Sequence, residues 1–294
     1  MKVETDISKC ATLVSLRMRK IGATKVSRSE SKSYAQLNNM DSQSVITSFR
    51  LFTGNDLGRV NSVYNTAKAI RDKYTLPWND LGQRMCPNTV FSEFNSHMIR
   101  LKDEWTIAVN DLENDYARII EDAKVRLNGK FDPTHFPPHI ANKFHFHLDV
   151  CPMPVGNGLR IEGLPDGELE KLQEERDRNT MEILRKSTAD VVERMKQAIE
   201  TLVSGTDGKG GLMNKDARFH QSSIDRVVEI LDMAPQLNIL DNPQVNNLVE
   251  DIKNTLRPEN LDANLIRKDN AIRTQVMTDS IQAVSKIQDA MSGF

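Results

Sequence analysis

The chain has 294 residues, of which 38% are hydrophobic and 27% are charged, and its formal net charge at pH 7 is -2. This near-neutral balance excludes a global basic field, the usual electrostatic mark of a nucleic-acid-binding protein. Gly and Pro are scarce, at 14 and 11 residues. Together with the low hydrophobic share, this predicts long uninterrupted helices that are exposed on much of their circumference.

The cysteines and the apolar residues bear on the compartment. The three cysteines, Cys10, Cys86 and Cys151, form no CxxC pair. An odd number without paired spacing favours reduced thiols over a disulfide framework or a structural zinc site. No apolar run approaches the ~20 residues of a membrane helix, and the N-terminus lacks the apolar core of a signal peptide. We therefore expect a soluble, cytoplasmic protein without membrane contact.

The first clear pattern is an alternating one. In LVSLRMRKI, residues 13–21, Val14, Leu16 and Met18 share one parity. Leu13 and the basic residues Arg17 and Arg19 share the other. This alternation predicts a short half-buried strand, with a helix as the alternative.

Two helices are predicted next. The first covers about 31–50. The second begins at Asn55 or Asp56, either of which can cap a helix. It ends before Pro77, because the residue preceding a proline is pushed out of the helical region. The stretch TLPWNDLGQRMCP, residues 75–87, is therefore expected to be an interhelical loop.

The clearest helix is predicted over 88–128, and Asn128-Gly129 is a good C-terminal signal. Its apolar residues recur at alternating steps of four and three, which is typical of a coiled-coil seam. A helix of this length extends for ~60 Å at 1.5 Å per residue. The seam consists of Val90, Phe94, Met98, Leu101, Trp105, Ala108, Leu112, Tyr116, Ile119 and Ala123.

A proline-rich region follows and predicts a small β-element. In KFHFHLDV, phenylalanines, Leu148 and Val150 alternate strictly with His145, His147 and Asp149. This predicts a strand over 143–151, and GLRIEGL predicts a second strand over 158–162. With residues 13–21, these segments could form a three-stranded sheet, which is about the minimum for stability.

The remaining residues predict helices over 166–204, 216–233, 242–257 and 258–291. The fold class is therefore mainly α. We expect a long antiparallel, coiled-coil-like helical hairpin of 88–128 against 166–204, with the small antiparallel β-element at its tip and helices flanking both ends. The predicted domains are 1–205, which holds the hairpin and the sheet, and a C-terminal helical segment, 206–294.

One candidate site is the histidine-rich strand. His145 and His147 are two residues apart and project from one face of a strand, so they could share a transition metal. The alternative is the exposed face of an amphipathic strand, since the spacing matches no known zinc signature. We expect no bound metal, and these two histidines are only weak candidates for a metal-dependent enzyme.

The second candidate is the stretch 75–87. Cys86 with the charged Arg84 and Asp80 could form a nucleophilic centre, but no histidine lies nearby to act as a base. We favour a bracing role for this stretch. Trp78 would then fill the core and Pro77 would fix the direction of the chain. Gly82 would permit a tight turn, and Arg84 would satisfy carbonyls at a helix end.

Other motifs weigh against enzymatic activity. The acidic residues of 103–122 include no Glu-x-x-His pair for a di-iron site. The chain also lacks a Walker A sequence and a dinucleotide-binding GxGxxG, which disfavours ATP hydrolysis or NAD chemistry. We therefore predict no catalytic residue and no cofactor.

A locally basic N-terminal segment leaves nucleic-acid binding as an alternative. Such a segment is more often simply a solvated face, and binding to DNA through it would weaken steeply with salt. The candidate contacts are Arg17, Arg19, Lys20, Lys25 and Arg28.

Several motifs, in order along the chain, resemble an uncharacterised family from phages, plasmids and integrative elements. They are LPWNDLGQRMCP at 76–87, Asp115-Tyr116, A..RL from Ala123, F.P..FP from Phe131, KFHFHLDVCPMP at 143–154 and LRI at 159–161. The resemblance covers about residues 10–205. It implies an accessory protein encoded beside a MoxR-like AAA+ ATPase and a von Willebrand A protein, located in the host cytoplasm. In that family the positions of His145 and His147 are not consistently histidine, and the pattern supplies no catalytic residue.

The sequence thus predicts a non-enzymatic phage or mobile-element protein that acts by protein–protein interaction. Long helices with thin apolar seams bury little area within one chain, so a second copy or another partner would complete the burial. We expect self-association as a scaffold or adaptor, with an AAA+ ATPase or another phage or host protein as a possible partner. The alternatives are nucleic-acid binding in phage DNA metabolism and a metal-dependent enzyme.

Overall fold

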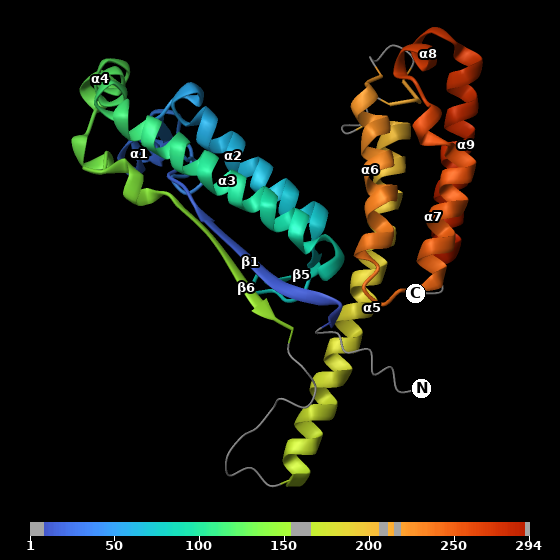
Figure 1. Cartoon of the computed structure of the whole chain (residues 1–294). Helices are drawn as coiled ribbons and strands as arrows, with labels where there is room; N and C mark the ends of the chain where they lie inside the picture. Colours follow the sequence, from blue (N-terminus) through green and yellow to red (C-terminus); the bar gives the residue numbers. More distant parts are fainter. Residues whose placement is uncertain (1–8, 154–165, 206–210, 215–218, 292–294) are drawn as a thin grey trace. The chain divides into compact units, whose positions relative to one another are not determined.

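The computed structural model describes residues 9–153, 166–205, 211–214 and 219–291 and is mainly α with a small antiparallel sheet (Figure 1). The chain forms two compact units. Unit 1 comprises Met1–Val14, Lys73–Ser92 and Val150–Phe294, and unit 2 comprises Ser15–Asp72 and Glu93–Asp149. This division differs from the predicted boundary at residue 205, which falls inside unit 1.

Four strands form one sheet, in the order β4 (Leu76–Pro77), β5 (Arg84–Pro87), β1 (Ala11–Arg19) and β6 (His145–Pro152). β5 is antiparallel to both neighbours, and Met85 lies opposite Leu13 on one side and Leu76 on the other. All three side chains are buried, which fixes the register of the strands. The predicted strands 13–21 and 143–151 are confirmed within two residues. The predicted strand 158–162 lies outside the described residues.

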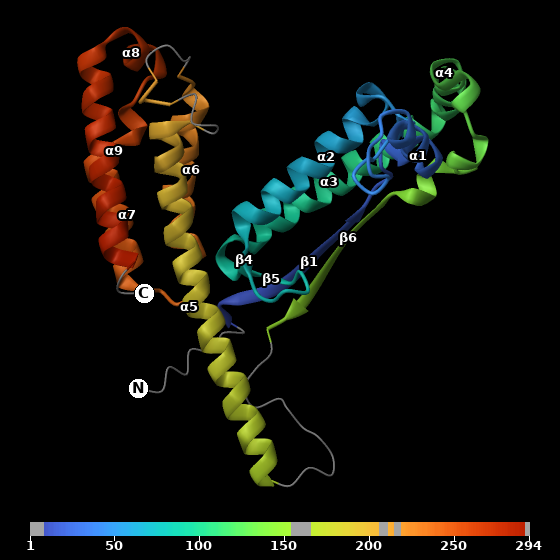
Figure 2. The same ribbon diagram turned by 180° about the vertical axis from the view of Figure 1, so that it is seen from behind.

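The core of unit 2 lies between strands β1 and β6 and two helices, α2 (Gly54–Tyr74) and α3 (Asn88–Asn114). Both views show these helices side by side (Figures 1 and 2). Trp105 of α3 is buried, with its ring centroid 6.0 Å from that of Phe144 and 6.1 Å from that of Phe146. Leu16 and Met18 of β1 pack against the same cluster. The predicted parity therefore matches the buried side at Leu16, Met18 and the two phenylalanines. Leu13, predicted on the basic side, is also buried, and Val150, predicted on the apolar side, is exposed.

Every residue of the apolar seam predicted over 88–128 is buried, but the segment is two helices. α3 ends at Asn114, and α4 (Tyr116–Leu127) follows Asp115, whose ψ angle opens to -5°. Asp is a weak helix former, and its side chain here lies 3.1 Å from Arg118 one turn later. Short 3₁₀ turns then lead to β6: η2 (Asn128–Lys130), η3 (Pro133–His135) and η4 (Ile140–Lys143).

The predicted helix 31–50 is wrong over its second half. The structure has a shorter helix, α1 (Arg28–Leu37). The strands on either side of it, β2 (Thr24–Val26) and β3 (Ser48–Arg50), pair as a two-stranded antiparallel ribbon. Asn39 adopts a left-handed φ of 48°, and the Asp41 carboxylate accepts the N–H of Gln43 at 3.3 Å. The left-handed backbone of Asn39 and the turn closed by the Asp41 carboxylate both end the helix, as Asn and Asp commonly do.

Unit 1 contains a helical bundle in which α5 packs against α6 and α9, and α7 packs against the same two helices. The helices are α5 (Asp166–Ser204), α6 (Gln221–Leu237), α7 (Pro243–Leu256), α8 (Ala263–Lys268) and α9 (Asn270–Met291), with a 3₁₀ turn, η6 (Pro258–Asn260). The predicted coiled-coil hairpin between 88–128 and 166–204 is not confirmed. The contacts described here pair α3 with α2 and α5 with α6 and α9.

The predicted helices 166–204 and 242–257 are confirmed, the second with Asn242 as its N-cap and Pro243 at its first position. The predicted helix 258–291 is instead divided. Asp262 caps α8 by accepting N–H groups of Asn264 and Leu265, and Asp269 caps α9 in the same manner. Each aspartate stabilises a new helix start and thereby interrupts the apolar pattern.

Tyr116 gives a test of the junction between α3 and α4. Its ring is buried, and its hydroxyl has no hydrogen-bond partner within the described residues. An unpaired buried hydroxyl costs about 1–3 kcal/mol, so Tyr116→Phe should leave stability unchanged or increase it. Denaturant unfolding at pH 8 measures this, with the exposed Tyr34→Phe as the control.

The pH dependence of the same variant provides a second readout. Burial and then the charge of Glu113 raise the pKa of Tyr116 to about 12. The unfolded chain loses this proton near pH 10, so the wild type should lose stability between pH 10 and 12 relative to the phenylalanine variant. A variant clearly less stable than wild type at pH 8 would show that the hydroxyl does make a stabilising bond.

Candidate functional surfaces

The stretch 75–87 folds as a hairpin whose turn is held by Asn79. The Asn79 side-chain oxygen accepts the N–H groups of Leu81 at 3.0 Å and Gln83 at 3.2 Å. The backbone N–H of Trp78 donates to the Gln83 carbonyl at 3.0 Å. Gly82 has a φ of +87°, a conformation that glycine adopts without strain. The sequence prediction of an interhelical connection therefore holds, but the connection is an ordered β-hairpin.

Two arginines fasten the chain where α2 ends. Arg84 donates to the Thr75 hydroxyl at 2.6 Å and to the Thr75 carbonyl at 3.0 Å. Arg194 of α5 donates to the same carbonyl at 3.0 Å. Guanidinium groups near the last carbonyls of a helix are favourable, because the C-terminal end of a helix is partly negative. This is the contact that the bracing interpretation expects of Arg84.

A groove of about 480 Å³ lies between this hairpin and α5 in unit 1. Trp78 is half-buried there and packs against the edge of the unit 1 core, so it does not fill the centre of that core. The Ser187 hydroxyl donates to the Pro77 carbonyl at 3.4 Å, which joins the two walls. Asp190 is neutralised by Arg194, whose nitrogen lies 2.7 Å from its carboxylate. The remaining lining residues are Asn79, Asp80, Ile183 and Lys186.

Cys86 is fully buried in β5, and burial raises the pKa of its thiol to about 12. A thiol with so high a pKa carries almost no thiolate at neutral pH, and thiolate is the nucleophilic form. The nearest polar contact is its own neighbour, the Pro87 carbonyl at 3.8 Å. This environment is that of a packing cysteine.

The histidine-rich strand presents an exposed polar face. His145 and His147 are both exposed, and His147 Nε2 lies 2.8 Å from the Asp149 carboxylate. Asp149 also forms an ion pair with Arg17 of β1. Although burial raises the pKa of Asp149, its hydrogen bonds from His147 and Arg17 lower it below the usual value. The part of the chain that the structure describes contains no group of three or more His, Cys, Asp or Glu residues placed to hold a metal ion.

The five basic candidates for nucleic-acid contact divide into two groups. Arg17 is paired with Asp149, and Lys20 donates to the Asn61 side chain with its ammonium 4.5 Å from the Tyr64 ring centroid. Arg19, Lys25 and Arg28 are exposed, and they form no ion pair among the described residues. Only this second group is free to meet an anionic partner.

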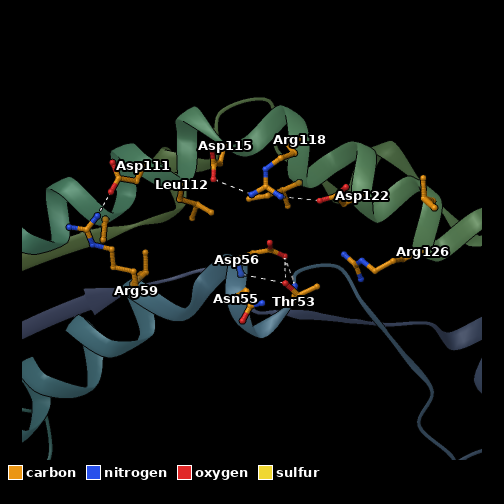
Figure 3. Close-up of a pocket in the computed structure, with 14 residues that line it drawn as sticks. Thr53, Asn55, Asp56, Arg59, Asp111, Leu112, Asp115, Arg118, Asp122 and Arg126 are labelled. Carbon is orange, nitrogen blue, oxygen red and sulfur yellow. Dashed lines mark hydrogen bonds and ion pairs between the residues drawn. The ribbon is translucent and has the colours of Figure 1, made fainter.

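A groove of about 730 Å³ lies in unit 2 between the start of α2 and the α3–α4 segment (Figure 3). Arg59 pairs with Asp111 across the groove, and Arg118 lies between Asp115, at 3.1 Å, and Asp122, at 3.0 Å. From the sequence, the acidic residues of 103–122 were considered only as possible metal ligands, and this groove was not predicted. The sequence feature that could have indicated part of this groove is the spacing of Asp115 and Asp122, three residues before and four residues after Arg118, which predicts ion pairs along a helix.

The remaining charged residues of this groove are also occupied. Asp56 accepts the N–H of Thr53 at 2.6 Å, which caps α2, and Arg126 donates to the carbonyls of Arg50 and Leu51 at 3.1 and 3.0 Å. Figure 3 shows Arg59 joined to Asp111, and Arg118 joined to both Asp115 and Asp122. These bonds fasten α2 to α3, and Arg126 fastens α4 to the segment before α2. A charged ligand would have to displace an existing partner.

Comparison with known proteins gives no relative for this chain. No family model matches it, and neither a curated protein nor a solved structure shows significant similarity to it. The resemblance to a phage and mobile-element family therefore stays a prediction. Among the described helices, none is both long and apolar enough to cross a membrane.

The two cysteines at opposite extremes of exposure test the assignment of Cys86. Cys151 is exposed, whereas Cys86 is buried with a raised pKa. Iodoacetamide at pH 8 should alkylate Cys151 within minutes and leave Cys86 unmodified until the protein is unfolded. Mass spectrometry of tryptic peptides measures both sites in one sample. Rapid modification of Cys86 in the folded protein would contradict the packing role and support Cys86 as a nucleophile.

Proposed function

We propose that this protein is a non-enzymatic interaction protein that self-associates, as a scaffold or adaptor, through the first half of α5. The observation that carries the proposal is the exposure of that half. No residue in 167–183 is buried, and the first buried side chain of α5 is Leu184. Only Met181 and Ile183 pack partly against the core of unit 1. The described residues of unit 1 thus leave about four turns of helix without a covered face.

An uncovered stretch of this length lacks the usual source of helix stability, because most helical stability in proteins comes from packing of an apolar face. Leu169, Leu172, Arg176 and Ile183 follow one another at steps that keep them near one stripe. Such a stripe is narrow, and a second helix laid along it would bury the leucines.

The charges along this half favour a second copy in the antiparallel direction. Its first turns are acidic, with Glu168, Glu170, Glu174 and Glu175, whereas Arg185 and Lys186 follow at its end. In an antiparallel pair the acidic start of one helix lies beside the basic end of the other, which sets orientation and register. A parallel pair would place like charges together.

The biological setting of the proposal rests on the resemblance alone. The family that the motifs resemble belongs to phages and mobile elements and is encoded beside a MoxR-like AAA+ ATPase. We propose on this basis that the protein is accessory to such an ATPase. A self-associating helical adaptor is compatible with that role, because it can present several copies of a docking surface to a ring-shaped partner.

Self-association is tested by light scattering coupled to size exclusion at 1–100 µM. We expect concentration-dependent oligomers with micromolar affinity, because a contact of about 25 Å along two helices is short. Leu169→Glu with Leu172→Glu should weaken association at least tenfold. The change loses two apolar anchors of ~1.5–3 kcal/mol each when fully buried.

The matched control is Ile99→Glu with Ile107→Glu. Both isoleucines are about half-exposed on another helix, α3, and the substitutions change charge and apolar area by the same kind of step. The control should still associate. A wild-type protein that remains strictly monomeric at 100 µM would rule out the proposal. Loss of association in the control variant alone would show that the interface lies on α3 and not on α5.

Nucleic-acid binding is the second candidate, and the free basic residues favour it. Residues 15–72 contain ten Lys and Arg but only four Asp and Glu. Within them, Arg19, Lys25 and Arg28 are exposed without ion pairs among the described residues. Cations of this kind can neutralise phosphates, each releasing a counterion from the nucleic acid.

The salt dependence of DNA binding tests this second candidate. Fluorescence anisotropy with a labelled 20-base strand should show affinity that falls steeply with salt, and changing Arg19, Lys25 and Arg28 to Ala should reduce the log–log slope by about 2. Changing Lys102, Lys143 and Lys268 to Ala is the control for charge alone. Absence of binding at 50 mM salt would eliminate this function.

A further inference from the structure

An apolar groove with a basic rim lies beside α1 in unit 2. Its volume is about 420 Å³, and the wall opposite α1 is formed by residues 42–46. Val26 and Ile46 line it with 56% and 78% of their surface exposed. Two large apolar side chains left this open beside one groove are the pattern of a docking site, whereas scattered exposed residues are ordinary. The other lining residues are Arg28, Ser31, Lys32, Ser42, Gln43 and Val45.

The two apolar residues are held on the same side of the β2–β3 ribbon. Val26 lies opposite Ser48 in the antiparallel register, and side chains two residues apart share a face, so Ile46 continues that face. The Ser27 N–H donates to the Thr47 carbonyl at 2.9 Å. Ser31 accepts the Thr47 N–H at 2.8 Å, and its hydroxyl donates to the Ser27 carbonyl at 2.7 Å. These bonds link β2, α1 and residue 47, so the groove is preformed.

The charge around the groove has one sign. Arg28 and Lys32 line it, no acidic side chain does, and neither residue has an ion-pair partner among the described residues. Glu30, on the same helix, is occupied by Lys130. Asp41, which precedes the far wall, uses its carboxylate to accept the Gln43 N–H. A ligand that meets both the apolar floor and this rim is therefore apolar and acidic.

The adjoining strand favours an extended ligand. In antiparallel pairing, the backbone groups of successive residues point alternately toward and away from the partner strand. Ser27 donates to Thr47 and Leu51 donates to Ala23, so the backbone groups of residues 23 and 27 point toward β3. By the alternation, the N–H and C=O groups of Thr24 and Val26 point away from β3. Within the described residues, β2 pairs with β3 alone. Val26 thus belongs to both the groove and an open strand edge, where a peptide can add as a strand.

We propose that this groove binds an extended acidic segment of a partner protein. An apolar side chain of that segment sits between Val26 and Ile46, and its carboxylates meet Arg28 and Lys32. The inference rests on the proposed role as an interaction protein and names the chemistry of the partner. A single-stranded nucleic acid could use the cations but would leave the two aliphatic side chains without a role.

The probes are three fluorescein-labelled eight-residue peptides in which glutamate and one apolar residue take turns at every second position, with serine between them. The apolar residue is valine, leucine or phenylalanine, and in an extended chain it shares one face with the glutamates. Anisotropy with the full chain should show saturable binding by at least one peptide below 1 mM. Arg28→Glu with Lys32→Glu, and separately Ile46→Ser, should each weaken binding at least tenfold. The control Lys102→Glu with Lys143→Glu carries the same change of charge within unit 2 and should bind as the wild type does.

Each other outcome overturns the proposal. It fails if no peptide binds, if a peptide with lysine in place of each glutamate binds equally well, or if Ile46→Ser has no effect. If a labelled oligothymidine binds instead and only the charge variants weaken it, the surface is a nucleic-acid site. Circular dichroism melting confirms that each variant is folded, and Ile46 is exposed enough to be replaced without loss of core.

Light scattering of the same variants separates this inference from the proposed self-association. If peptide binding is lost while the oligomer persists, the groove and the α5 contact are independent surfaces. A protein that binds the peptide as a monomer would contradict self-association and leave the groove intact.

Discussion

The limited supply of apolar side chains constrains every part of this structure. The chain has 38% hydrophobic residues and places most of them in two separate clusters, one in each unit. Long helices need a continuous stripe of such residues along each covered face. In unit 2 the apolar side chains gather around Trp105 and its aromatic neighbours, and in unit 1 they gather in the bundle around α5. The start of α5 and the groove beside α1 contribute no buried residue to either cluster.

The sequence predicted those elements whose signal lies within one segment. The seam from Val90 to Ala123 is buried at every predicted position, and the boundaries of 166–204 agree with α5 because both ends carry strong local signals. The alternation of residues 13–21 and 143–151 identified the side of each strand that packs against Trp105, although Leu13 and Val150 depart from it. For the seam and the strands, the period of the apolar residues carries the prediction.

The wrong predictions share a different physical origin. Residues 38–47 were predicted as helix, although the left-handed φ of Asn39 and the hydrogen bond from the Gln43 N–H to the Asp41 carboxylate end it. Asp262 and Asp269 divide the last predicted helix by the same chemistry. The sequence could not predict which helices pack against each other. Packing depends on how the apolar faces of two helices fit together, and a sequence pattern shows the apolar face of each helix separately. The ion pair of Arg59 with Asp111 joins residues 52 positions apart, so the groove in Figure 3 had no continuous signature.

Net charge proved a poor guide to this protein because charge of opposite sign lies in different segments. The total of -2 conceals residues 15–72, with six more basic than acidic residues, and an α5 whose first turns are mainly acidic. Ion pairs then remove Arg17 from the basic set, and the contact with Asn61 engages Lys20. Arg19, Lys25, Arg28 and Lys32 keep their charge exposed. At a physiological Debye length of ~8 Å, a partner near these residues feels this local group and not the sum over the chain. A surface field therefore has to be judged on the folded unit, after its own carboxylates have found their partners.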